Sequence, residues 1–174
     1  KRKGKNQMAE KNNNYILIEM PGSGKSTIGV LLAKALGYDF VDTDLVIQQK
    51  GGGLLKEIIA RIGNDGFKQL EEDVNASIDV NKSVIAPGGS AVYSDKAMRH
   101  FKEIGTIIYL KLDYQTVKRR LGNLKARGVV LEKGQTLRDL YNERIPYYEK
   151  YADITVKLDK LSIGNSLEKV LENL

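Results

Sequence analysis

The stretch PGSGKST, residues 21–27, decides the fold of this 174-residue chain. It follows the apolar run YILIEM, residues 15–20, and precedes residues 26–36, whose apolar positions recur at helical spacing. A glycine-rich turn between a strand and a helix is the setting of a phosphate-binding loop, because its backbone N–H groups and the helix N-terminus attract the same anion. The sequence therefore predicts a nucleotide-phosphate site.

Two side chains of this loop carry the chemistry that a nucleotide needs. Lys25 places a positive charge near the β- and γ-phosphates, and the Ser26 hydroxyl is an oxygen ligand for Mg²⁺. No N-K-x-D or T-K-x-D motif, which would read guanine, follows a later strand, so ATP is favoured over GTP. The predicted nucleotide-binding residues of the loop are Gly22, Ser23, Gly24, Lys25, Ser26 and Thr27.

One position of the loop departs from the full pattern G-x-x-x-x-G-K-[ST]. Glu19 stands where that pattern has its first glycine. A side chain there is expected to strain a turn suited to glycine, and its carboxylate is expected to repel a triphosphate. The alternative is a glycine-rich turn that binds no nucleotide.

The rest of the chain alternates strand-like with helix-like segments. Strands separated by helices predict an α/β fold, with a five-stranded parallel sheet covered on both faces and ligands at the carboxyl ends of the strands. Pro146 predicts a kink or break within its helix. The predicted strands are 15–20, 40–42, 83–86, 106–110 and 154–156, and the predicted helices are 26–36, 45–63 with an interruption at 51–53, 65–79, 94–101, 114–121, 136–151 and 162–174.

Two carboxylates, Asp42 and Asp44, follow the second predicted strand. Strand alternation places them on the same side. One is expected to support hydrated Mg²⁺, and the other to orient an acceptor hydroxyl and accept its proton. The alternative is that Asp44 only caps the next helix.

Composition and charge exclude several classes of protein. With Cys 0 and His 1, the chain has neither a disulfide framework nor a cysteine- or histidine-based zinc site. Residues 1–11 hold five basic residues and one glutamate, so they carry +4 of the net charge of +6. We expect residues 1–13 to be a disordered basic tail or an expression remnant rather than a nucleic-acid arm. The chain has no apolar run of ~20 residues and no apolar core of a signal peptide, so no membrane partner and a cytoplasmic location are expected.

Six motifs in this order resemble the shikimate kinase family. They are PGSGKST, VDTD, GNDGFKQLEE (63–72), PGGSAV (87–92), KRRLGN (118–123) and NERIPYYEKYAD (142–153). The resemblance covers residues 14–174 and implies a single P-loop kinase domain. Its fold would be a three-layer α/β/α sandwich, with a lid at about residues 122–134.

The resemblance also implies roles for individual residues. Asp44 would contact the acceptor's hydroxyls, Asp42 would support Mg²⁺, and the Gly88–Gly89 turn would lie at the substrate. Lys68 and Arg144 would bind its carboxylate. Arg120 would stack on adenine, and Arg127 would close on the phosphates, so that the catalytic residues would be Lys25, Asp44 and Arg127.

Three further positions depart from the family's pattern. Lys68 stands where the family has an arginine, Ser90 where it has a third glycine, and Gly128 where a proline usually follows the lid arginine. A lysine is a point charge and cannot grip a carboxylate with two parallel bonds.

The expected function is ATP-dependent phosphorylation of a hydroxyl on a small, carboxylate-bearing polyol. Shikimate, converted to shikimate 3-phosphate in aromatic amino-acid biosynthesis, is the best single candidate, and ATP and Mg²⁺ are the expected cofactors of a monomer. The alternatives are a kinase for a gluconate-type sugar acid or a nucleoside monophosphate, and a nucleotide-binding homologue without catalysis.

Overall fold

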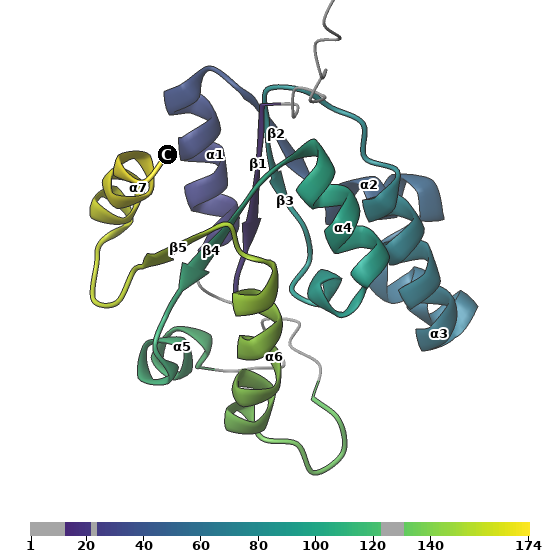
Figure 1. Cartoon of the computed structure of the whole chain (residues 1–174). Helices are drawn as coiled ribbons and strands as arrows, with labels where there is room; N and C mark the ends of the chain where they lie inside the picture. The colour runs from purple at the N-terminus through teal and green to yellow at the C-terminus, as the bar shows by residue number, and fades with distance from the viewer. Residues whose placement is uncertain (1–12, 22–23, 123–130) are drawn as a thin grey trace, which may run out of the picture.

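Five parallel strands form one sheet in the order β2-β3-β1-β4-β5 (Figure 1). The structure is a computed structural model that describes residues 13–21, 24–122 and 131–174. The strands are β1 (Asn14–Ile18), β2 (Asp39–Asp42), β3 (Ser83–Ala86), β4 (Gly105–Lys111) and β5 (Ile154–Lys157). This confirms the predicted five-stranded parallel sheet.

The strand β1 lies at the centre of the sheet. Tyr15 is in register with Val84 of β3 on one side and with Thr106 of β4 on the other. Both neighbours come much later in the chain, and β1, β3 and β4 are almost wholly buried, as strands covered on both faces should be. The loop that follows β1 therefore leaves from the middle of the sheet, at its carboxyl end.

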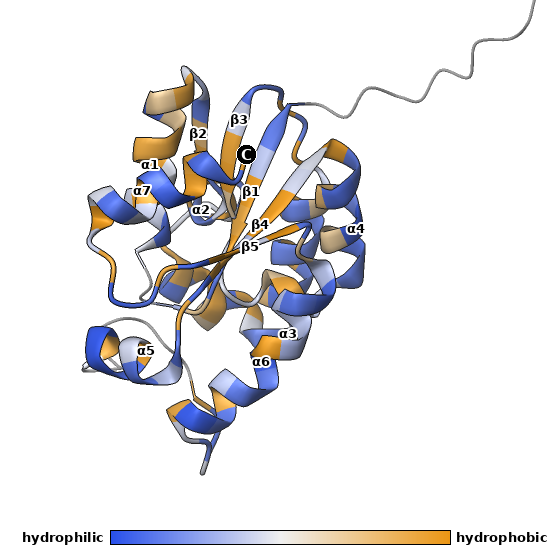
Figure 2. Ribbon diagram, turned by 60° about the vertical axis from the view of Figure 1, so that its left-hand side comes forward, coloured by the Kyte–Doolittle hydropathy of each residue, from blue (hydrophilic) through white to orange (hydrophobic). Residues whose placement is uncertain are grey.

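Helices cover both faces of the sheet and complete the α/β sandwich. α1 and α7 lie on one face, and α4 lies on the other with α3 beside it, in both ribbon views (Figures 1 and 2). The helices are α1 (Lys25–Leu36), α2 (Thr43–Gly51), α3 (Leu55–Ala76), α4 (Asp95–Ile104), α5 (Tyr114–Leu121), α6 (Leu137–Tyr151) and α7 (Ile163–Glu172), with a 3₁₀ turn η1 (Ala91–Tyr93). Within the described ranges, no helix is long and apolar enough to span a bilayer.

Apolar strands and inward helix faces build the main core (Figure 2). α1 packs closely on β2 at Gly29, where a Cβ atom would lie 2.6 Å from the ring of Phe40. A second, smaller core of Ile47, Ile58 and Val74 joins α2 to α3. This second core fixes the α2–α3 pair, which forms one wall of the cavity described below.

The sequence pointed to two weak points within helices, at Gly63 and at Pro146. The break expected between residues 63 and 65 is confirmed, because Gly63 takes a non-helical conformation (φ 75°, ψ 174°) that kinks α3 at this point. The break considered at Pro146 is absent: α6 runs through it as one helix. A proline removes one backbone donor, and the packed helix tolerates that loss.

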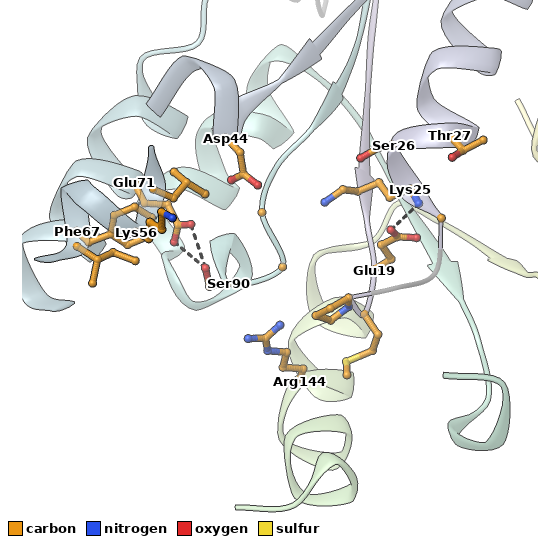
Figure 3. A pocket seen from close by; sticks show the side chains of 17 residues that line it. Glu19, Lys25, Ser26, Thr27, Asp44, Lys56, Phe67, Glu71, Ser90 and Arg144 are labelled. Carbon is orange, nitrogen blue, oxygen red and sulfur yellow. Dashed lines mark hydrogen bonds between the residues drawn. The ribbon is translucent and has the colours of Figure 1, made fainter. Parts of the chain in front are cut away.

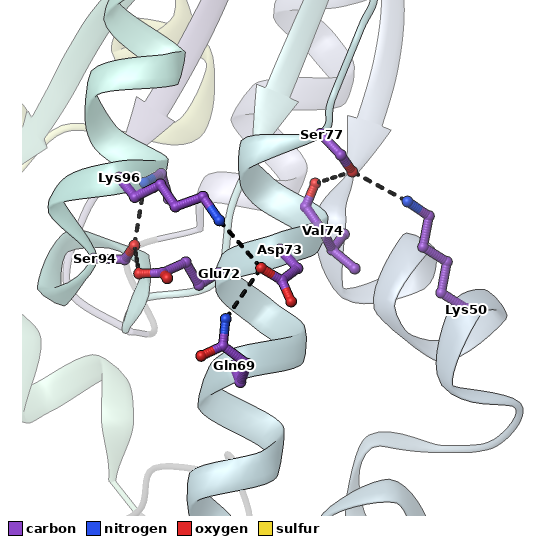
Figure 4. Close-up of polar contacts among 9 residues, drawn as sticks. Lys50, Gln69, Glu72, Asp73, Val74, Ser77, Ser94 and Lys96 are labelled. Carbon is purple, nitrogen blue, oxygen red and sulfur yellow. Dashed lines mark hydrogen bonds and ion pairs between the residues drawn. The ribbon is translucent and has the colours of Figure 1, made fainter.

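Polar contacts hold the C-terminal half of α3 against α4 (Figure 4). The Ser94 hydroxyl accepts a bond from the backbone N–H of Ala97, as an N-cap, and donates one to Glu72. Lys96 Nζ lies 3.3 Å from Asp73 Oδ1. These contacts fix the helix that carries Glu71 into the cavity.

Candidate active site

A cavity of about 800 Å³ opens at the carboxyl ends of the strands (Figure 3). Its walls come from the end of β1 and the start of α1, from the turn after β3, and from α2, α3 and α6. The polar and glycine residues that line it are Glu19, Gly24, Lys25, Ser26, Thr27, Asp44, Lys56, Glu71, Gly88, Gly89, Ser90 and Arg144. The topology thus collects segments far apart in sequence around one space.

The start of α1 forms the phosphate side of this cavity. Gly24 is the N-cap in a left-handed conformation (φ 89°), which glycine adopts without strain, and no side chain caps the helix there. Instead the nearby Glu19 Oε1 accepts a hydrogen bond of 2.8 Å from the backbone N–H of Lys25. The Lys25 ammonium donates to the carbonyl oxygen of Pro87.

The expectation that Glu19 strains its turn is wrong. In the described part of the chain, the residues other than glycine with positive φ are Lys82 and Lys160. The Glu19 backbone therefore does not need a glycine. Its side chain is 4% exposed and its carboxylate turns toward the helix N-terminus, where backbone N–H groups favour an anion.

Asp42 and Asp44 take different positions in the structure. Asp42 is the N-cap of α2, because its Oδ1 accepts a 2.9 Å bond from the Asp44 N–H, so the alternative in which Asp44 is the cap is wrong. Asp44 lines the cavity, whereas Asp42 is not among the lining residues in the described ranges. Burial raises the pKa of Asp44, the charge of Asp42 raises it further, and Lys25 opposes both.

Three charged side chains closely approach the glycines of the turn after β3. A Cβ on Gly88 would lie 3.2 Å from Asp44 Oδ1 and 3.3 Å from Glu71 Oε2, and one on Gly89 would lie 2.8 Å from an Arg144 nitrogen. The glycines therefore allow two carboxylates and a guanidinium to meet at this turn.

Glu71 is a cavity residue to which the sequence assigned no role. It is 8% exposed, and both of its carboxylate oxygens accept from the Ser90 hydroxyl, at 2.9 and 3.0 Å. Burial raises the pKa of Glu71, the Ser90 bond opposes this, and the charge of Asp44 adds to it. Ser90, where the family pattern has glycine, thus gains a buried partner.

Two basic residues of the cavity lie away from the phosphate side. Arg144, on α6, donates from Nε to the Tyr93 hydroxyl at 3.3 Å, and its guanidinium carbon lies 5.5 Å from the centre of that ring. Lys56, in the first turn of α3, also lines the cavity and was not predicted to do so. Lys68 is exposed and is not among the described residues that line it.

Arg120 is not among the described residues that line the cavity. Arg120 lies on α5, where it donates to the carbonyl of Leu161 at 3.5 Å. Gly22, Ser23 and Arg127 lie outside the described residues, as does most of the expected lid.

Comparison with known proteins identifies the family. The family model described as "Shikimate kinase" matches residues 21–174. The chain belongs to the shikimate kinase family. It is 38% identical over 160 residues to the shikimate kinase of Chlorobium chlorochromatii, covering 86% of this chain and 84% of that protein. It is 35% identical over 174 residues to the shikimate kinase of Pasteurella multocida, covering 96% and 99%.

Solved structures agree with the shikimate kinase assignment. Shikimate kinase from Acinetobacter baumannii in complex with shikimate superimposes with a TM-score of 0.81, at 29% identity, over 94% of this chain and 93% of that one. The chain is therefore an ATP-dependent phosphotransferase that acts on a hydroxyl acceptor.

Proposed function

We propose that this shikimate kinase family member transfers the γ-phosphoryl group of ATP to a hydroxyl of shikimate. The observation that carries the proposal is the cavity itself, in which the N-terminus of α1 and Lys25 face Asp44 and Arg144 across one space. A helix end suited to an anion, a candidate base and a cation suited to a carboxylate, all lining one cavity, support the proposal. The shikimate complex of the Acinetobacter baumannii relative supports the choice of acceptor.

The proposed reaction needs a base at the acceptor and positive charge at the phosphates. A P–O bond forms to the acceptor oxygen, the bond from the γ-phosphorus to the bridging oxygen breaks, ADP leaves, and Asp44 takes the hydroxyl proton. Its raised pKa makes Asp44 a better proton acceptor than an ordinary aspartate. Lys25 lies at the start of α1 and neutralises charge on the transferred group.

The residues present fit a magnesium ion bound together with ATP. Mg²⁺ at such sites is held largely by phosphate oxygens and waters, with one or two protein oxygens. The Ser26 hydroxyl, exposed to the cavity in the first turn of α1, is such an oxygen, and Asp42 lies at the end of the nearby β2. When bound, the ion neutralises charge on the phosphates.

The alternative acceptors carry different groups, so each would need different side chains in the cavity. A nucleoside monophosphate brings a second phosphate, which calls for several arginines on the acceptor side, and the described walls there offer Arg144 and Lys56. A sugar acid of the gluconate type carries one carboxylate but is an open chain. Shikimate, the acceptor with a ring, fits best, because Leu55, Ile59 and Phe67 give the cavity an apolar lining beside its polar groups.

An acceptor panel tests this function. ADP release is measured in a coupled assay with shikimate, gluconate or a nucleoside monophosphate at equal concentration. We expect turnover with shikimate to exceed turnover with either other acceptor by at least ~100-fold, because unpaired charges left in the wrong complex are costly. Preference for gluconate would replace the proposed acceptor. ATP binding without turnover on any acceptor would contradict catalysis altogether.

A further inference from the structure

Glu19 makes a contact that the phosphoryl-transfer reaction does not use. Its carboxylate lines the cavity, is nearly buried, and accepts from the backbone N–H of Lys25 at 2.8 Å (Figure 3). That N–H belongs to the first turn of α1, so no carbonyl within the helix accepts from it. A protein carboxylate thus occupies an anion position at the mouth of the phosphate loop.

A nucleotide phosphate requires the same position. The N–H groups of the first helical turn and the partial positive charge of the helix end are what bind a phosphate at such loops. An N–H that already donates a hydrogen bond to a carboxylate is not available to a phosphate oxygen. In addition, two anions at one helix end repel each other. Binding of the nucleotide and the Glu19 contact therefore compete.

We propose that Glu19 sets the nucleotide affinity of this enzyme by acting as an internal competitor for the phosphate position. The incoming phosphate takes the Lys25 N–H, and the carboxylate must move away from it. The inference rests on nucleotide binding at α1, which is part of the proposed function. It predicts that the penalty falls on phosphate groups and not on the adenine or the acceptor.

Calorimetry on Glu19 variants tests this inference. Pyrophosphate, ADP and adenosine are titrated into the wild-type chain, Glu19→Gly, Glu19→Gln and the control Glu168→Gln, which changes an exposed carboxylate on α7. We expect Glu19→Gly to tighten pyrophosphate and ADP by at least ~10-fold, and Glu19→Gln, which keeps an acceptor oxygen but loses the charge, to tighten them by less. Adenosine binding should not change, and the control should match the wild type.

Two results would overturn the role of Glu19. The first is that Glu19→Gly unfolds as cooperatively as the wild type but binds pyrophosphate equally or more weakly. The contact between Glu19 and the Lys25 N–H would then be purely structural. If Glu19→Gly does not fold, Glu19→Gln decides by the same criterion. Failure of wild type and variants alike to bind pyrophosphate would instead refute the anion site itself, and the proposed function with it.

A second inference comes from an independent observation, the positions of two lysines on α3. Lys56 lines the cavity on the α3 wall, and Arg144 lines it from α6 (Figure 3). Among the residues that the structure describes, no carboxylate forms an ion pair with Lys56. Both lysines are exposed, but Lys68, which directly follows the lining residue Phe67, is not among the described residues that line the cavity.

The geometry points to Lys56, rather than Lys68, as the second cation for the acceptor's carboxylate. This inference rests on the proposed function, and it names a different residue from the one that the family pattern supplies. A flexible lysine at the start of α3 reaches into the cavity and pairs as a point charge, while Arg144 supplies a planar, directional partner.

Direct binding of shikimate distinguishes the two lysines. Shikimate is titrated into wild type, Lys56→Ala, Lys56→Arg, Lys68→Ala and Arg144→Ala, with ADP titrations as the check on the nucleotide side. We expect Lys56→Ala to weaken shikimate binding by ~10-fold, the effect of losing one charge-assisted contact, and Lys56→Arg to restore it. Lys68→Ala should change it less than ~2-fold, and Arg144→Ala should weaken it more than Lys56→Ala.

The opposite pattern, with loss in Lys68→Ala and none in Lys56→Ala, would return the role to Lys68. Equal, small effects of both would leave Arg144 as the sole cation and refute the inference. A wild-type chain that binds ADP but no shikimate would refute the proposed acceptor instead, so the two failures are distinguishable.

Discussion

Lys25→Ala is expected to reduce turnover by at least ~100-fold, which is the scale of removing one strong electrostatic stabiliser of a transition state. Lys25 starts α1 at the edge of the cavity, and its ammonium donates to the Pro87 carbonyl, one residue before the glycine turn. Its charge therefore lies between the phosphate side and the acceptor side. Alanine preserves the helix but removes the positive charge that stabilises the phosphoryl group during its transfer.

Steady-state assays with saturating ATP and acceptor measure the effect, because they separate turnover from binding. Lys34→Ala is the matched control, since Lys34 is an exposed lysine in the last turn of the same helix. It should retain the wild-type rate. Turnover of Lys25→Ala within a few-fold of wild type would contradict the assignment of the phosphate loop.

Asp44→Asn is expected to have opposite effects on activity and stability. The amide cannot accept the hydroxyl proton, so turnover should fall by ~10²–10⁴-fold, the usual contribution of a positioned base. Because burial raises the pKa of Asp44, the folded state binds this proton more tightly than the unfolded state does. The stabilisation that this proton provides is complete at pH values below the pKa of Asp44 in the unfolded state. It is lost as the pH rises through the pKa of Asp44 in the folded state.

At neutral pH the ionised Asp44 therefore costs stability, and its removal should raise Tm. Thermal unfolding of wild type and Asp44→Asn at pH 4 and pH 7.5 measures this, and the difference in Tm should be larger at pH 7.5. Wild-type turnover should fall on acidification as Asp44 becomes protonated. A variant with lower Tm at pH 7.5, or with near-normal turnover, would contradict the role of Asp44.

The order of elements follows from local patterns in the sequence. Apolar runs, helical spacing and glycine turns predict five strands separated by helices, and the structure has them in one parallel sheet. The interruption at Gly63 was predicted as well. The continuity of α6 through Pro146 was not predictable, because packing decides whether a proline ends a helix.

The cavity was predictable only in part. The residues after β1, β2 and β3 line it because parallel strands end at one edge of the sheet. Which face of α3 turns toward it depends on how α2 and α3 pack through their own small core, and this is a tertiary property. Lys56 and Glu71 were missed for that reason. The capping role of Asp42 had a local signal, an aspartate directly before the helix, but a cap was considered only for Asp44, as the alternative to its role at the acceptor.

The central position of β1 has a consequence for synthesis of the chain. Its register partners lie around Val84 and Thr106, so a nascent chain exposes this apolar strand until well over half of the protein has been made. Such long-range parallel pairings form slowly, and unpaired apolar strands aggregate. We therefore expect ribosome-bound chains that end before β4 to be sensitive to protease and to recruit chaperones, and chains that include β4 to become resistant.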